Sequence, residues 1–119
     1  MKAYTDIEQS RKLAEILPIE SADGFYATDD NIIITEPYIT YLNGERNIPA
    51  YKGAVPCWSL AALLSVIREA IGYTIYGVNN VYMSCDLGDK PWKLETKVYN
   101  NEVDACIDMI IKLHELNLL

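Results

Sequence analysis

The sequence lacks any apolar stretch long enough to cross a membrane. A membrane-spanning helix needs about 20 consecutive apolar residues, and charged residues interrupt every hydrophobic stretch before that length. The opening residues, MKAYTDIEQSRKLAEIL, carry charges throughout, whereas an export signal needs an uninterrupted apolar segment. These absences predict a soluble, cytoplasmic protein with no membrane partner.

Motifs for metal binding and thiol chemistry are also missing. The three cysteines, Cys57, Cys85 and Cys106, are far apart and form no C-x-x-C pair, so neither a zinc site nor a redox centre is indicated. His114 is the only histidine, and any Ser-His or Cys-His mechanism would need it as the base. Near the end of a predicted helix, a packing or capping role suits it better. We expect no metal, no cofactor and no enzymatic activity.

Nucleic-acid and phosphate binding have little support. The six glycines are too dispersed to form a phosphate-binding loop. The longest basic grouping is Lys90, Lys93 and Lys97, and Glu95 lies within it. Because phosphate contacts need clustered Lys or Arg, a solvated sheet face is the better interpretation of this grouping.

Basic residues are absent between Lys12 and Arg46, and this gap divides the chain electrostatically. The formal net charge is −7. The gap contains seven acids, so it accounts for the whole of this net charge. These acids are Glu15, Glu20, Asp23, Asp29, Asp30, Glu36 and Glu45. Such an asymmetry can indicate a basic partner.

The N-terminal part predicts one helix followed by short strands. A capping box of Thr5 and Glu8 would start the helix at about Asp6, and Pro18 would end it at Leu17. Strands are expected within 32–35 and 38–42, where β-branched and aromatic residues gather. The stretch 43–56 is rich in Gly and Pro and gives no clear pattern.

The rest of the chain reads as helix, three strands and helix. Ser59 would cap the middle helix, and Asn100 or Asn101 would cap the last one. Between them, apolar residues alternate along 81–87 and 92–98, which places Val98 on the buried face, and a turn at 77–80 would join 73–76 as a third strand. The prediction is one α+β domain over 1–119. It has two layers, with helices covering one face of an antiparallel sheet whose C-terminal part is a three-stranded meander.

Three segments carry a resemblance to known proteins. They are IEQSRKLAEILPIESAD at 7–23, VPCWSLAALL at 55–64 and VDACIDMIIKLHELNLL at 103–119. Together they resemble a family of small uncharacterised proteins that phages and integrated mobile elements of gut Bacteroidales encode. In that family Pro-x-Trp-Ser-Leu opens a middle helix, and an amphipathic helix closes the chain. The resemblance implies an accessory role but no activity, cofactor or site residue.

The candidate site is the acidic, tyrosine-bearing part of the chain. We expect a non-enzymatic protein that binds a basic protein partner, because tyrosine offers both apolar area and a hydroxyl at an interface. The candidate binding residues are Asp29, Asp30, Glu36, Tyr38 and Tyr41. The alternative is a small enzyme or ligand-binding domain with a pocket between the sheet and the loops, in which carboxylates or His114 supply the polar groups.

Overall fold

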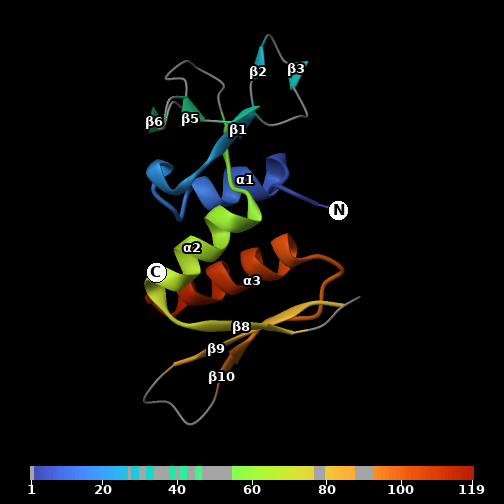
Figure 1. Ribbon diagram of the computed structural model, residues 1–119, viewed down its shortest axis with the longest axis vertical. Helices are drawn as coiled ribbons and strands as arrows, with labels where there is room; N and C mark the ends of the chain where they lie inside the picture. Colours follow the sequence, from blue (N-terminus) through green and yellow to red (C-terminus); the bar gives the residue numbers. More distant parts are fainter. Residues whose placement is uncertain are drawn as a thin grey trace. The chain divides into compact units, whose positions relative to one another are not determined.

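Figure 1 shows the helices and strands of the computed structural model of the chain. Backbone and side chains are described for 2–26, 55–72, 80–87 and 93–119, and backbone alone for 28–29, 32–33, 38–39, 41–42, 45–46 and 73–76. Contacts divide the chain into two compact units, which are Tyr4–Ala62, and Leu63–Leu119 together with Met1–Ala3. The expectation of a single domain stays a prediction, and each unit is described by itself.

The unit Tyr4–Ala62 is built on one helix and a small antiparallel sheet. Helix α1 is followed by the 3-10 turn η1, and strand β1 lies between β4 and β7. The described part of this unit also contains two further antiparallel pairs, β2 with β3 and β5 with β6. The bounds are α1 Ile7–Ala14, η1 Ile19–Ser21, β1 Gly24–Tyr26, β2 Thr28–Asp29, β3 Ile32–Ile33, β4 Tyr38–Ile39, β5 Tyr41–Leu42, β6 Glu45–Arg46 and β7 Val55–Cys57.

Strand β7 falls where the sequence gives no clear pattern, and its composition explains why. It contains Pro56, which cannot donate a backbone hydrogen bond and normally argues against a strand. In the sheet order β4-β1-β7 the strand lies at an edge, which tolerates proline. The expected strand 38–42 is divided between β4 and β5, which pair with different partners.

Helix α1 starts one residue later than predicted. The N-cap is Asp6, whose Oδ1 accepts a hydrogen bond from Gln9 N at 2.8 Å, while Gln9 Oε1 accepts one from Asp6 N at 3.0 Å. The capping box is therefore Asp6 with Gln9, and the predicted box of Thr5 with Glu8 is wrong. The helix also ends earlier, at Ala14, with Glu15 as its C-cap.

The second unit contains three antiparallel strands and α3. Helix α2 (Leu60–Ala70) begins in the first unit and contributes Leu63 onward to the second. Strands β8 (Tyr73–Tyr76), β9 (Tyr82–Asp86) and β10 (Lys93–Glu95) form a sheet in the order β10-β9-β8, and α3 (Glu102–Glu115) contacts β9. The predicted α+β class is confirmed.

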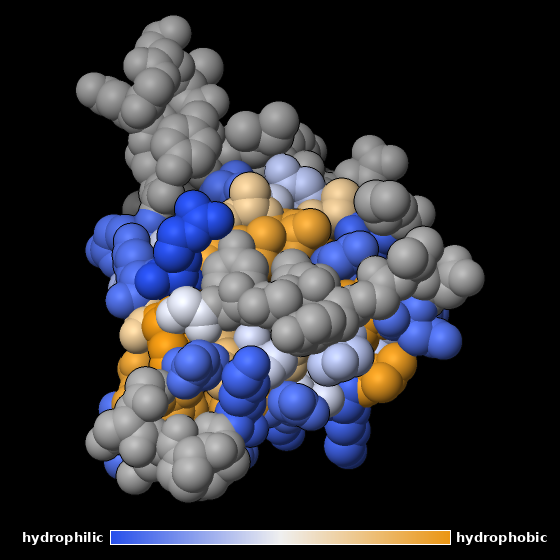
Figure 2. Space-filling model, turned by 60° about the horizontal axis from the view of Figure 1, so that its bottom comes forward, coloured by the Kyte–Doolittle hydropathy of each residue, from blue (hydrophilic) through white to orange (hydrophobic). Residues whose placement is uncertain are grey.

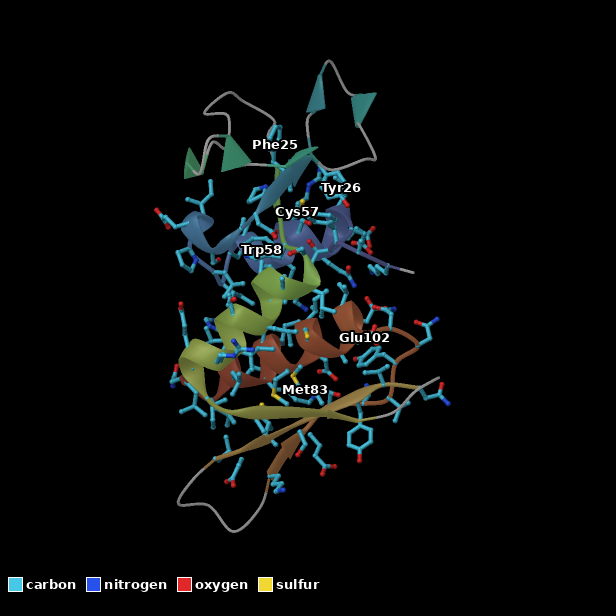
Figure 3. The ribbon with its side chains drawn as sticks, viewed as in Figure 1. Phe25, Tyr26, Cys57, Trp58, Met83 and Glu102 are labelled. Carbon is cyan, nitrogen blue, oxygen red and sulfur yellow. The ribbon has the colours of Figure 1, made fainter. Side chains whose placement is uncertain are left out.

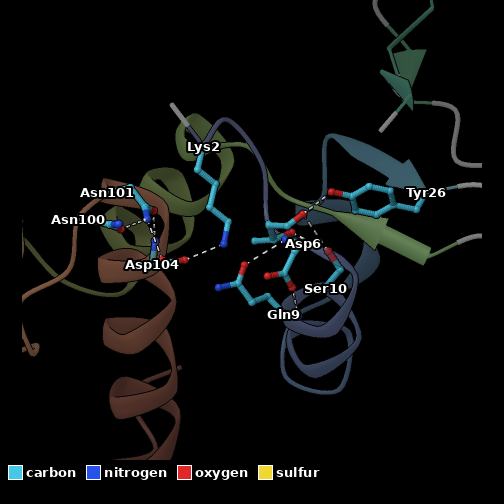
Figure 4. Close-up of polar contacts among 9 residues, drawn as sticks. Lys2, Asp6, Gln9, Ser10, Tyr26, Asn100, Asn101 and Asp104 are labelled. Atoms are coloured by element: carbon cyan, nitrogen blue, oxygen red, sulfur yellow. Dashed lines mark hydrogen bonds and ion pairs between the residues drawn. The ribbon is translucent and has the colours of Figure 1, made fainter. Parts of the chain in front are cut away.

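The N-terminal caps of α2 and α3 agree with the prediction. Ser59 Oγ accepts a hydrogen bond from Ala62 N at 3.2 Å at the start of α2. At the start of α3, Asn101 Oδ1 accepts from Asp104 N at 2.8 Å, and Asp104 also pairs with Lys2 Nζ at 2.8 Å (Figure 4). Each cap satisfies a backbone donor that the first helical turn leaves open.

The core of the second unit contains the central helical side chains of the apolar pattern, but not every predicted position is buried, since Leu94 is half-buried and Ala70 is exposed. Its fully buried side chains include Leu63, Ile67, Met83, Met109, Ile110 and Leu113. Val98 is a clear departure, because the sequence alternation predicts it to be buried and it is 60% exposed. The chain between β10 and Tyr99 has one residue more than regular pairing with the neighbouring strand requires, and this insertion turns Val98 outward.

None of the described helices has the length and hydrophobicity that crossing a bilayer requires.

Candidate functional site

An open hollow of about 300 Å³ lies at the first turn of α1. It is lined by Asp6, Ile7, Glu8 and Tyr26. Two of these side chains are carboxylates, and the other two supply an aliphatic chain and an aromatic ring. The hollow therefore combines negative charge with an apolar wall inside a single unit.

Tyr26 is a fixed wall of this hollow. Its hydroxyl donates a hydrogen bond to the Thr5 carbonyl at 2.7 Å, and the side chain is 6% exposed (Figure 4). Burial raises the pKa of Tyr26, and nearby Cys57 and Asp6 raise it further. The phenol is therefore neutral near pH 7, and its hydroxyl proton is donated to the Thr5 carbonyl.

Two buried hydroxyls, those of Thr5 and Ser10, help to hold the residues that line the hollow in place. Thr5 Oγ1 lies 2.7 Å from Ser10 Oγ and accepts a hydrogen bond from Trp58 N at 3.1 Å. The Thr5 amide also donates to the Trp58 carbonyl at 3.0 Å. Thr5 and Ser10 are both fully buried. These contacts join Thr5, the residue before the N-cap of α1, to the residue after β7, so Thr5 is unavailable as a helix cap.

The first turn of α1 supplies the negative charge. The carboxylate of Asp6 caps the helix through Gln9 N, and Glu8 is exposed in the same turn. Acidic groups are favoured there because the helix dipole is positive at its N-terminus. Arg11 and Lys12 occupy the last turn, so the charge of α1 changes sign along its length.

Asp23 belongs to the predicted acidic stretch, and its side chain has a structural role that the described residues show. Its Oδ1 accepts from Ser59 N at 2.8 Å, and its Oδ2 accepts a short hydrogen bond from Ser59 Oγ. Burial raises the pKa of Tyr4, and the charge of Asp23 adds to that effect. Asp23 therefore stabilises the start of α2, and its carboxylate is occupied within the unit.

Two other acids of that stretch, Glu15 and Glu20, have exposed side chains. Ile19, which precedes Glu20, is 49% exposed and adds an apolar contact beside the charge.

The sequence-predicted site residues lie mainly outside the described part of the structure. Asp30 and Glu36 are outside it altogether. Asp29, Tyr38 and Tyr41 are described only by their backbone pairing, with Ile32, Phe25 and Arg46 respectively. Their role in binding stays a prediction. The lining residues Asp6 and Glu8 were not predicted as site residues. The signal that could have identified them is the pair of acids at the start of the first helix.

The cysteines sit in the interior of their units. Figure 3 labels Cys57 at the end of β7, together with Tyr26 of β1 and Trp58, the residue after β7. Burial raises the pKa of Cys57 and of Cys106 to about 12, and that of Cys85 to about 11. All three thiols are therefore protonated near pH 7, the form that is a poor nucleophile.

His114 is exposed, and its backbone carbonyl accepts a hydrogen bond from Asn117 N at 3.0 Å. Within the described ranges, no three His, Cys, Asp or Glu side chains are grouped so that they could hold a metal ion.

Hydrophobic side chains reach the surface in separate places between hydrophilic ones (Figure 2). The large exposed ones in the described part are Ile19, Val98, Leu116, Leu118 and Leu119. Scattered apolar residues of this kind are ordinary on a protein surface, so the mixed character of the hollow is the more specific feature. Comparison of the chain with protein-family models, curated proteins and solved structures finds no match.

Proposed function

We propose that this chain is a non-enzymatic interaction protein that binds a basic protein partner through the hollow at the start of α1. The observation that carries the proposal is the lining of the hollow, in which the carboxylates of Asp6 and Glu8 stand beside Ile7 and Tyr26. The predicted binding residues Asp29, Asp30, Glu36, Tyr38 and Tyr41 extend the contact from the same unit. The resemblance to Bacteroidales phage and mobile-element proteins supports an accessory role of this kind.

A lysine or arginine side chain of the partner matches this lining in both of its parts. The aliphatic stem of such a side chain packs on apolar surface while its charged end stays near carboxylates or water. Ile7 and Tyr26 provide the apolar wall, and Glu8 provides an exposed carboxylate.

The second candidate is a small enzyme or ligand-binding domain, and the size of the hollow favours it. A volume of about 300 Å³ is at the lower end of small-molecule sites. Because the hollow is lined by carboxylates, a small ligand there would also be a cation. The same titration that tests the protein partner therefore separates the two candidates.

The test is a titration of the isotope-labelled chain with a short lysine-containing peptide, followed by amide chemical shifts. Binding at the hollow should move the signals of Ile7, Glu8 and Tyr26, and Glu8→Gln should weaken binding severalfold. Glu15→Gln is the matched control, because it removes the same charge from an exposed acid that does not line the hollow. Shifts that avoid the hollow would contradict the proposal, whereas binding of free lysine amide as tightly as the peptide would favour the second candidate.

A further inference from the structure

The segment between β10 and α3 contains a change of strand register. Lys93 pairs with Asp86 and Glu95 pairs with Ser84, and Thr96 N continues this register by donating to Met83 O at 2.9 Å. Further along, Val81 pairs with Tyr99 through two backbone hydrogen bonds of 2.6 and 2.7 Å. A regular strand would bring Val98 opposite Val81, so one extra residue has been inserted.

The extra residue forms a β-bulge opposite Tyr82. Lys97 and Val98 together occupy the length that one residue would take on a regular strand, which is the defining property of a bulge. Because side chains alternate between the two faces, the insertion turns Val98 outward and leaves it 60% exposed. Thr96 stays buried, and its Oγ1 accepts the hydrogen bond of Met83 N at 2.9 Å.

A regular register is compatible with the same backbone donors and acceptors. Val81 needs one donor and one acceptor opposite it, and Val98 can supply both as well as Tyr99 does. The apolar alternation of Leu94 and Val98 also matches the buried face in that register. The sequence therefore contains two competing pairings, and the bulged one leaves an apolar side chain in water.

Asp108 on α3 favours the bulged pairing. Its Oδ2 accepts a hydrogen bond from Lys97 N at 3.0 Å and another from the Tyr99 hydroxyl at 3.0 Å. Its Oδ1 is 3.1 Å from Lys112 Nζ, one helical turn further along. Two of the three donors come from the bulged segment, and both would move away if Tyr99 left its place opposite Val81.

We propose that 96–99 is a two-register switch in which the carboxylate of Asp108 selects the bulged register and so displays Val98 on the surface. Without that carboxylate, Val98 takes the place of Tyr99 opposite Val81 and becomes buried. The extra residue then moves into the connection to α3, where Asn101 keeps its cap.

The experiment compares the full chain with its Asp108→Ala variant. In the parent, amide NOEs should connect Val81 with Tyr99; in the variant they should connect Val81 with Val98. A Val98→Cys substitution gives a second readout, because the native thiols are buried and react slowly. Its labelling rate should fall about tenfold or more when Asp108 is replaced, since reaction then requires local opening. Lys93→Cys is the control, because Lys93 is exposed and precedes the bulge.

A folded Asp108→Ala chain that retains the Val81 to Tyr99 contact and labels at the parental rate would overturn the proposal. If circular dichroism shows that this variant is unfolded, Asp108→Asn takes its place. Asparagine keeps one acceptor oxygen and the size of the side chain but loses the charge. The labelling rate at Val98→Cys should therefore fall below that of the parent, by less than the tenfold expected for Asp108→Ala. A rate equal to that of the parent would again contradict the switch.

Discussion

Single buried polar side chains fix the backbone of this protein at positions where the chain must change direction. Thr5 is the clearest example, because its hydroxyl serves Ser10 Oγ and Trp58 N, and its backbone serves Tyr26 and Trp58. A buried donor that loses its partner costs more than an average hydrogen bond contributes. The wall of the hollow therefore depends on a residue that does not line it.

Replacing Thr5 with Val tests this dependence. Valine has nearly the same shape but no hydroxyl, so Trp58 N would lose its acceptor and Ser10 would lose one partner. We expect the free energy of unfolding to fall by about 1–3 kcal/mol, measured by urea denaturation. Thr5→Ser keeps the hydroxyl and should retain most of the stability. Equal stability of the Val variant and the parent would show that water satisfies these groups.

Helices and strands in this chain were predictable where their signals are local. Ser59 precedes an apolar helical stretch and was identified as a cap from the sequence, whereas the last helix had two candidate caps, Asn100 and Asn101, of which the structure uses Asn101. The start of α1 was misplaced by one residue because Thr5 is bonded to Trp58, which is far away in the sequence. Val98 was misplaced because the bulge depends on Asp108 of another element. The end of α3 was not predicted in detail either.

That end is a Schellman motif. Leu118 N donates to Leu113 O at 2.9 Å and Asn117 N donates to His114 O at 3.0 Å, with Asn117 in the left-handed conformation at φ 58°. Asparagine tolerates this conformation better than most residues other than glycine. His114 takes part in this motif through its backbone carbonyl, which does not test the capping role expected of its imidazole. The hollow of α1 was likewise hidden from sequence reasoning, because it requires Tyr26 of β1 to meet the first turn of a helix.

The contacts of Asp108 predict an acid-sensitive link between β10 and α3. Partial burial raises its pKa, but hydrogen bonds from Lys97 N, Lys112 and Tyr99 outweigh that effect, so the pKa is lowered below 3.8. A carboxyl with a lowered native pKa stabilises the fold fully above its unfolded pKa, and this contribution disappears as the pH falls through the native value. Stability should therefore decline below about pH 4. Urea denaturation of Asp108→Asn should show a shallower decline over the same range; an identical decline would assign the effect to other carboxyls.

The whole molecule is electrostatically uneven, and this property leads to the last prediction. The excess negative charge belongs to the stretch between Lys12 and Arg46, part of the unit that also contains the hollow. Charges at the rim of an interface act mainly on the association rate, because they steer the encounter over a distance of about 10 Å at 0.1 M salt. Replacing Asp29, Asp30 and Glu36 with Asn, Asn and Gln should therefore slow association with an immobilised lysine-rich peptide and leave dissociation nearly unchanged.

The matched control removes the same amount of charge elsewhere. Glu69, Glu95 and Glu115 are exposed and belong to the second unit, and their replacement by Gln should slow association less. Surface plasmon resonance at two salt concentrations separates the effects, since added salt should slow the parent more than the first triple variant. Replacing Tyr38 or Tyr41 should instead speed dissociation if either ring is buried in the contact. Equal slowing by both triple variants would mean that net charge alone attracts the peptide, and the acidic stretch would then have no specific part in binding.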